Sequence, residues 1–444
     1  MNNPEKLKVE LIAHACIRIE TQHSVVLCDP WFSGYSFNDG WRLEPVPDPE
    51  KINLDNVTHI WISHEHPDHF HFPTLKAIAD RIDPTSVQVL FQETNSEKVF
   101  NALDGMGFTN HRVLRHLERR PLDEQMDVFV YSHRHLDSCL GIIFEGKNAL
   151  LNVNDTELNP HDCKIIREKF GAFRVLFNQF SIAGFEGYFD SEEMESNRME
   201  VLDKMVQHHR NLGANITVPF ASYMSFAKTD NHELNQFANS SLQAKAHLES
   251  NGCQCVLIEP TSGGSALNDI SADDATDYYR SYYDNRVLEV NDVESVPIED
   301  CMEAFGHRTE VWKAKTNPFI YGKIREVTAN IEDLQICATL DFQHCQLLIR
   351  EDLSPMDCDL RINSQPLYQA FSTLFGIQTL GVSGRYRFKR RVPSWKLVRI
   401  ISSLSNAEVF LSLRGIVNLQ TIRWAWNRRH GLLSQIRQQK ERFS

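Results

Sequence analysis

The stretch WISHEHPDHF at residues 61–70 limits most strongly what this chain can fold into. Its first three residues end an apolar run, VTHIWIS (57–63), that has the pattern of a buried strand. The loop after this strand carries four potential metal ligands within six positions, namely His64, His66, Asp68 and His69. His64 and His66 can bind one ion from a tight turn, and Asp68 and His69 can face a second ion or support the first. Imidazole suits zinc, iron and manganese, so the pattern predicts a metal site and leaves the metal open.

Strand-like and helix-like runs alternate in the first half of the chain. LKVELIAHACIRIE and VVLCDP have the pattern of paired strands, and residues 191–212 have that of a polar helix. Polar residues gather where strands end. This order predicts an α/β layered fold with a site at strand ends.

Changes in composition along the chain predict four parts. Residues 1–268 form the catalytic domain, and residues 269–315 form an acidic connecting segment with short helices. Residues 316–415 have the pattern of a smaller α+β domain, weakly similar to sterol-carrier proteins, which could form a homodimer or hold an apolar group. Residues 416–444 form a basic amphipathic tail.

Charge is distributed unevenly along the sequence. The whole chain has a net charge of −13, yet residues 385–444 hold fourteen Lys and Arg against two acidic residues. Tryptophans interleave these basic residues, so we expect the tail to bind an anionic membrane surface. The alternative is a helix packed on the acidic body of the protein. A nucleic-acid partner is disfavoured because no recognised nucleic-acid fold accompanies the charge.

The sequence begins without the apolar core of a signal peptide and contains no run of eighteen apolar residues. Ten scattered cysteines, several of them in strand-like runs, are typical of reduced thiols rather than of a disulfide framework. We therefore expect a cytoplasmic protein, peripheral at a membrane if the tail binds lipid.

Further motifs resemble those of the metallo-β-lactamase superfamily. VVLCDPWFSG resembles its early strand that ends in aspartate, HLDSCLGIIFE its histidine followed six residues later by glycine, and ALLNVND its bridging carboxylate. The resemblance implies an αββα sandwich in which Asp29 orients the metal loop. It also implies one or two divalent ions, zinc, iron or manganese. The implied ligands are His64, His66 and His135 for the first ion, and Asp68, His69 and the shared Asp155 for the second.

One ligand of the family pattern is missing. The last histidine should follow the strand near VPFASY (218–223), where the sequence has none. Four histidines elsewhere are alternatives: His161, His208, His209 and His232. The second position could therefore be incomplete, which would leave a single metal ion.

Two branches of the superfamily resemble this chain. Ala13-His14-Ala15 partly matches the G-H-A stretch of sugar-phosphate lactonases and N-acylphosphatidylethanolamine phospholipase D. Later segments, including FNQFSIAGFEGYF and ITVPFASY, resemble the catalytic part of CMP-N-acetylneuraminate hydroxylase. Together they imply a small-molecule substrate bound by residues near the strand ends, with these candidates: His14, Asn178, Gln179, Ser222 and His232. His14 could equally be structural.

The two branches imply different chemistry at the same ligands. In a hydrolase, Asp68 or Asp155 would orient a metal-activated water and take its proton during attack on an ester or phosphodiester of a sugar, nucleotide or lipid. In the alternative, a non-haem iron oxygenase would need an electron-transfer partner, since the sequence has no cysteine–histidine pairs of a Rieske cluster. We expect the hydrolase.

Overall fold

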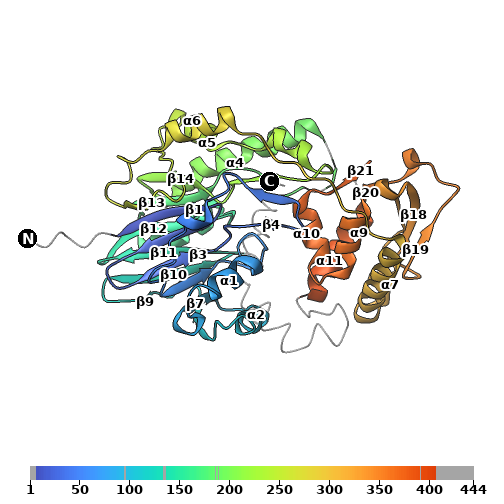
Figure 1. Cartoon of the computed structure of the whole chain (residues 1–444), viewed down its shortest axis with the longest axis horizontal. Coiled ribbons are helices and arrows are strands. Elements are labelled where there is room, and N and C mark those ends of the chain that lie inside the picture. Colours follow the sequence, from blue (N-terminus) through green and yellow to red (C-terminus); the bar gives the residue numbers. More distant parts are fainter. Residues whose placement is uncertain are drawn as a thin grey trace, which may run out of the picture.

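The computed structural model describes residues 7–94, 97–133, 137–185, 187–188, 190–390 and 392–406. Two β-sheets face each other in the N-terminal part, and helices cover their outer sides (Figure 1). The larger sheet has the order β16-β1-β2-β3-β6-β7-β8. Its strands are β1 (Lys8–Ala13), β2 (Cys16–Glu20), β3 (Val25–Cys28), β6 (His59–Ile62), β7 (Gln88–Gln92), β8 (Asn110–Leu114) and β16 (Ser265–Ala266).

The second sheet has the order β14-β13-β12-β11-β10-β9. Its strands are β9 (Arg120–Pro121), β10 (Met126–Ser132), β11 (Ser138–Phe144), β12 (Lys147–Asn154), β13 (Val175–Gln179) and β14 (Ile216–Phe220). Alternation along each strand divides its side chains between two cores. In β10, Val128 and Val130 enter the core between the sheets, whereas Phe129 and Tyr131 face the helices outside.

Helices complete the sandwich on both sides. α1 (Phe72–Ala79) and α2 (Lys98–Asp104) pack on the outer side of the first sheet through a core that includes Leu75 and Leu103. α3 (Pro160–Phe170) and α4 (Ser191–Leu212) cover the second sheet through Ile166 and Leu212. This arrangement confirms the predicted αββα sandwich, and α4 has the bounds of the predicted polar helix.

Two more helices and a small sheet flank the sandwich. α5 (Ser241–Ser250) and α6 (Thr276–Asn285) pack against each other, and Tyr279 of α6 enters the central core. Tyr279 lies in the predicted connecting segment, so part of that segment is packed on the N-terminal sandwich. The small sheet consists of β4 (Tyr35–Ser36), β5 (Trp41–Leu43) and β15 (Met224–Phe226).

The C-terminal part has a core of its own, built on a sheet of order β19-β18-β17-β20-β21. Its strands are β17 (Val327–Ile331), β18 (Ile336–Asp341), β19 (Gln346–Ile349), β20 (Leu360–Ile362) and β21 (Tyr386–Phe388). Its helices are α7 (Ile298–Lys315), α8 (Pro318–Tyr321), α9 (Ser364–Ser372), α10 (Gly376–Ser383) and α11 (Pro393–Asn406). An α+β unit is therefore present, but Phe305 and Trp312 of α7 belong to its core. The unit thus begins before the predicted boundary at residue 316.

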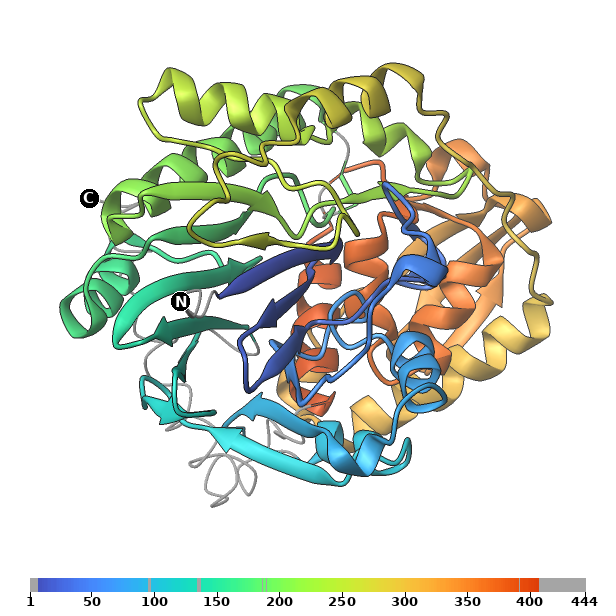
Figure 2. The same ribbon diagram turned by 60° about the vertical axis from the view of Figure 1, so that its left-hand side comes forward.

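A buried ion pair joins the two parts. The side chain of Arg385, fully buried, donates to both carboxylate oxygens of Asp230, at 3.0 and 3.1 Å. It also donates to the carbonyl of Asn38 beside β4, at 2.8 Å. Figure 2 shows the first strands, β1 and β2 in dark blue, between the green second sheet and the orange C-terminal helices.

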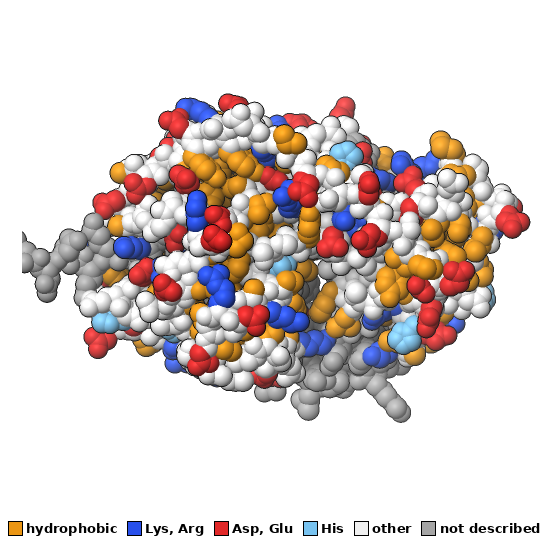
Figure 3. All heavy atoms as spheres, viewed as in Figure 1, with side chains coloured by type: hydrophobic (Ala, Val, Ile, Leu, Met, Phe, Trp, Pro, Cys, Tyr) orange, Lys and Arg blue, Asp and Glu red, His pale blue; other side chains and the backbone are white. Residues whose placement is uncertain are grey.

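The face shown in Figure 3 intersperses acidic and basic side chains. Within the described residues, no helix combines the length and hydropathy needed to cross a membrane. The predicted basic tail, residues 416–444, lies outside the described residues, so its membrane partner stays a prediction.

Candidate metal centre

Three strands of the sandwich end at one place and deliver the polar residues there. β3 ends before Asp29, β6 ends just before Ser63 and His64, and β12 ends before Asp155. β3 and β6 are parallel neighbours, so their carboxyl ends meet at the same edge of the sheet. The loop predicted to bind metal therefore lies at a strand edge, as the sequence pattern required.

The first group of convergent ligand atoms comes from His64, His66 and Asp155. Nε2 of His64 lies 2.7 Å from Nδ1 of His66 and 3.5 Å from Oδ2 of Asp155. His64 is buried, whereas His66 and Asp155 are partly exposed. This position therefore has a side open to solvent.

The second group comes from His14, Asp68 and His69, all of them buried. Nε2 of His14 and Nε2 of His69 each lie 3.2 Å from the same oxygen, Oδ2 of Asp68. The position they surround is more enclosed than the first one.

Asp155 links the two groups. Its Oδ2 lies 3.5 Å from Nε2 of His64 and 3.7 Å from Nε2 of His69, one histidine from each group. A carboxylate between two histidine groups can bridge two cations, which is the role implied for Asp155 by the sequence motif.

Neighbouring side chains determine which ring nitrogen of His64 and of His69 faces the metal positions. Nδ1 of His69 donates to Oδ2 of Asp29 at 3.0 Å, so Nε2 is directed at the second group. The Ser63 hydroxyl lies 2.8 Å from Nδ1 of His64 and leaves Nε2 for the first group. Asp29 is fixed in turn by the Ser63 amide, at 2.7 Å, and by the side-chain amide of Asn154, at 2.7 Å. Such partners orient metal-binding histidines and raise their basicity.

Hydrogen bonding within the described residues fits a divalent cation. Three buried atoms of these side chains have no hydrogen-bond partner there, namely Oδ1 of Asp68, Nε2 of His69 and Oδ1 of Asp155. Buried polar atoms are rarely left without partners, because the cost is about 1–3 kcal/mol each. A set of imidazole and carboxylate donors that converge in this way suits zinc, iron or manganese.

The protonation equilibria reflect crowded carboxylates. Burial raises the pKa of Asp155 to about 8, and the nearby charges of Asp137 and Asp68 add to the effect, while His69 opposes it. Burial alone would lower the pKa of His69, but the carboxylates of Asp68, Asp155 and Asp29 raise it well above its usual range. A divalent cation would relieve the same excess of negative charge.

Aromatic rings wall the second group. The ring centroids of Trp31 and Trp41 lie 5.1 and 6.4 Å from that of His14. The Phe37 ring lies 6.1 Å from that of His66, which belongs to the first group. Trp31 and Phe37 come from the segment between β3 and β5, and Trp41 is the first residue of β5; all three are buried. This segment also meets the C-terminal part through Arg385. The rings exclude water from one side of the site.

The other predicted residues are spread more widely. Asn178 is buried and its Oδ1 lies 2.9 Å from Nδ1 of His208. The Ser222 hydroxyl accepts from the amides of Phe180 and Ser181. Gln179 ends β13 and is partly exposed. Their role in substrate binding stays a prediction.

The four alternative histidines and His135 complete the predicted set. His232 is exposed and its Nδ1 bonds the Thr229 carbonyl at 3.1 Å. Within the described residues, neither convergent group includes His161, His208, His209 or His232. His135 lies outside the described residues, so its role as a ligand stays a prediction.

Sequence reasoning missed several residues of the site. Asn154 and Ser63 hold Asp29 and His64, and their only signal was adjacency to Asp155 and to the histidine loop. Asp137, whose charge acts on Asp155 and His66, follows the predicted ligand His135 by two positions.

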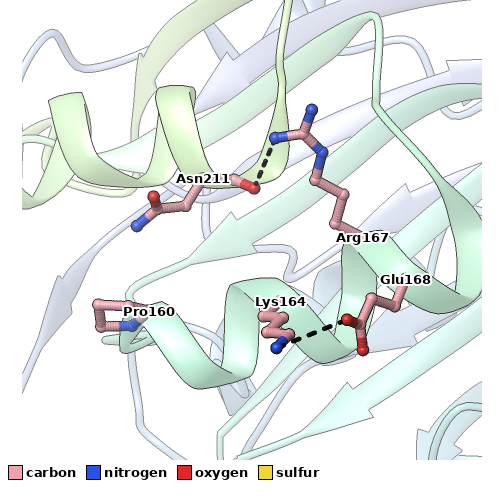
Figure 4. Close-up of a pocket in the computed structure, with 5 residues that line it drawn as sticks. All are labelled: Pro160, Lys164, Arg167, Glu168 and Asn211. Carbon is pink, nitrogen blue, oxygen red and sulfur yellow. Dashed lines mark hydrogen bonds and ion pairs between the residues drawn. The ribbon is translucent and has the colours of Figure 1, made fainter.

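A surface hollow lies elsewhere, between α3 and the end of α4 (Figure 4). Its charged side chains already have partners, since Lys164 pairs with Glu168 at 3.7 Å and Arg167 donates to the Asn211 carbonyl at 3.3 Å. None of the convergent ligands lines it.

A family profile described as "Beta-lactamase superfamily domain" matches residues 8–118. Cytidine monophosphate-N-acetylneuraminic acid hydroxylase of Xenopus laevis is 27% identical over 229 residues, covering 49% of this chain and 38% of that protein. The mouse hydroxylase is 27% identical over 237 residues, covering 50% of this chain and 41% of that protein. The chain thus spans about two fifths of the length of these curated relatives.

Among the similar solved structures is CmlA, a diiron β-hydroxylase from Streptomyces venezuelae. The two structures superpose with a TM-score of 0.41 and 16% sequence identity, over 59% of this chain and 54% of CmlA.

Proposed function

Because this chain belongs to the metallo-β-lactamase superfamily, we propose that it is a metal-dependent hydrolase acting on an ester or phosphodiester of a sugar, nucleotide or lipid. The observation that carries the proposal is the position of Asp155, whose Oδ2 lies between one histidine of each convergent group. A divalent ion held by these groups would supply an acidified water and stabilise negative charge that develops on the substrate.

The protein's own residues have distinct tasks in this proposal. Asp155, on the partly exposed side of the site, orients the attacking water and takes its proton. Asp68, buried between His14 and His69, holds its charge because these histidines lower its pKa well below the usual range against the effect of burial. Trp31 and Trp41 keep bulk water from the enclosed side.

The names of the curated relatives favour a second candidate. Each is a hydroxylase, so the same ligands in this chain could serve an iron-dependent oxygenase that takes electrons from a partner protein. The two candidates differ in the source of the oxygen atom that enters the product.

Elemental analysis and an EPR spectrum of protein purified without added metal come first. The protein loaded with zinc, manganese or ferrous iron is then assayed on a panel of carboxylic esters, lactones and phosphodiesters. Product oxygen is traced with labelled water and, separately, with labelled dioxygen. Hydrolysis predicts label from water alone, and Asp155→Asn should lower turnover at least about 100-fold. Asp277→Asn, at a 96% exposed carboxylate on α6, serves as the matched control.

Label from dioxygen, with iron as the active metal and a reductant required, would contradict hydrolysis and establish the oxygenase. Full turnover in Asp155→Asn would contradict the role of Asp155, and the hydrolase proposal rests on that role.

A further inference from the structure

This chain lacks the last histidine of the superfamily's metal-binding pattern, yet the enclosed metal position has another histidine, His14, beside Asp68 and His69. Nε2 of His14 and Nε2 of His69 lie at equal distance, 3.2 Å, from Oδ2 of Asp68. We propose that His14 is the third protein ligand of this position and replaces the histidine expected after β14. The inference rests on the metal dependence of the proposed function, but not on the reaction.

The backbone brings His14 close to the segment after β14, where the missing histidine is expected. β1 ends at Ala13 and β2 begins at Cys16, so His14 opens a two-residue turn. Its carbonyl accepts from the amide of Ala221 at 3.0 Å, and Ala221 directly follows β14. The tip of the first hairpin is therefore bonded to the segment in which the family pattern expects its last histidine.

The backbone of His14 is left-handed. Its φ of 35° is uncommon for residues other than glycine, although histidine, asparagine and aspartate adopt positive φ more often than other residues. Strained backbone of this kind persists where the surroundings hold it and clusters at functional sites. Here the backbone directs the imidazole at Asp68 and His69, and the Trp31 ring packs edge-on against it.

The other candidates for the missing ligand are engaged elsewhere. Both ring nitrogens of His208 have partners, Asn178 Oδ1 at 2.9 Å and the Leu158 carbonyl at 2.8 Å. Nδ1 of His209 lies 2.9 Å from the Thr217 hydroxyl. His232 is exposed on a short helical turn. Among described histidines outside the 64–69 loop, His14 alone belongs to a convergent group of ligand atoms.

Counting metal ions tests the proposal without reference to any substrate. Purified full-length protein is stripped with a chelator, reconstituted with excess zinc, passed over a desalting column and analysed for zinc per chain. We expect about two ions in the wild-type protein and about one in His14→Asn, which removes a strong ligand and tolerates a left-handed backbone. His14→Asp should restore the second ion, because a carboxylate can bind zinc from the same turn.

Two further variants complete the design. His14→Gly removes the ligand and the backbone strain together, so it reports on the metal even if His14→Asn folds poorly. His232→Asn is the matched histidine control and should keep two ions. Cobalt substitution adds a spectroscopic reading, since loss of a nitrogen ligand at one position changes the visible absorption of that ion.

Two results would overturn the assignment. The first is a wild-type metal content that both His14→Asn and His14→Gly retain. The second is a loss of metal in these variants that His14→Asp does not reverse, which would assign His14 only to the support of Asp68. Neither result bears on whether the enzyme hydrolyses or oxygenates, which the oxygen-labelling experiment decides.

Discussion

Asp29 illustrates how one residue can determine the chemistry of several others. It accepts from His69, Ser63 and Asn154 while fully buried. Its acceptance from Nδ1 of His69 leaves Nε2 free for a cation, which is the tautomer that a ligand requires. The metal centre is therefore organised by a residue that supplies no ligand atom to either convergent group.

His59 is one source of acid sensitivity outside the metal centre. Burial, assisted by the charge of Arg112, lowers its pKa to about 4. An unfolded chain has a histidine pKa of about 6.5, so between these values the unfolded state binds more protons than the folded one. The contribution of the neutral His59 ring to the free energy of unfolding is therefore complete above pH 6.5, and it is lost as the pH falls toward 4.

We therefore predict that His59→Gln loses less stability than the wild-type protein between pH 7.5 and pH 5. The difference should be roughly 1 kcal/mol, measured by urea unfolding at the two pH values. His23→Gln, at an exposed histidine, should follow the wild-type protein. Equal losses in all three proteins would show that His59 does not contribute to the acid sensitivity.

At the residue scale, the sequence predicted the metal loop but not the whole centre. His64, His66, Asp68 and His69 lie within one short stretch after a strand, so their spacing alone was informative. His14 precedes Asp68 by 54 residues and reaches it only through a hairpin tip and a strained backbone. The partial motif at Ala13-His14-Ala15 made His14 a site candidate, but no local pattern reports its contact with Asp68.

At the scale of elements, alternation and helical periodicity were sufficient for much of the sandwich. The polar helix at residues 191–212 has the predicted bounds, and β6 lies within the predicted strand at 57–63. The boundary of the C-terminal unit could not be predicted in the same way. The sequence of α7 does not show which unit the helix belongs to, and only its packing assigns Phe305 and Trp312 to the C-terminal core.

Gly141 on β11 gives a prediction at this scale. A Cβ atom there would lie 2.0 Å from a ring carbon of Phe129, and that ring stacks on Phe170 at a centroid distance of 3.6 Å. Gly141→Ala should lower the free energy of unfolding by about 2–3 kcal/mol, because the stacked rings leave no room for a methyl group. Urea unfolding monitored by circular dichroism measures the loss.

Two variants test the cause of this loss. Gly105→Ala adds the same methyl group where the nearest atom is 3.4 Å away, and should change the free energy of unfolding by less than about 0.5 kcal/mol. Phe129→Leu combined with Gly141→Ala should lose less than the sum of the two single changes. Simple additivity would refute the proposed collision with Phe129.

At the scale of the whole molecule, the junction between the two parts depends on Arg385 and Asp230, which are 155 positions apart. Asp230→Ala would leave the Arg385 guanidinium buried without its counter-charge. The expected loss in the free energy of unfolding is about 3–5 kcal/mol, the usual range for removal of one partner from a buried pair. Differential scanning calorimetry would also reveal whether the two parts then unfold separately.

The neighbouring pair of Arg387 and Glu233 offers a matched control, since the Glu233 side chain is 53% exposed. Glu233→Ala should cost less than about 1 kcal/mol. Similar losses for Asp230→Ala and Glu233→Ala would argue against a special role for the buried pair.

Five residues around the metal centre that are not glycine have left-handed backbone: His14, Asp29, Phe37, Asn154 and Ala221. Each such conformation costs on the order of 1–3 kcal/mol. These residues form a rim around the metal centre, and the protein is less stable with them than it would be with glycine at the same positions. A selection for heat resistance alone would favour glycine at these positions. Ala221 supplies no side-chain ligand and could accept that change, whereas His14 and Asp29 could not do so without loss of the site. Laboratory evolution under heat and under activity should therefore diverge first at this rim.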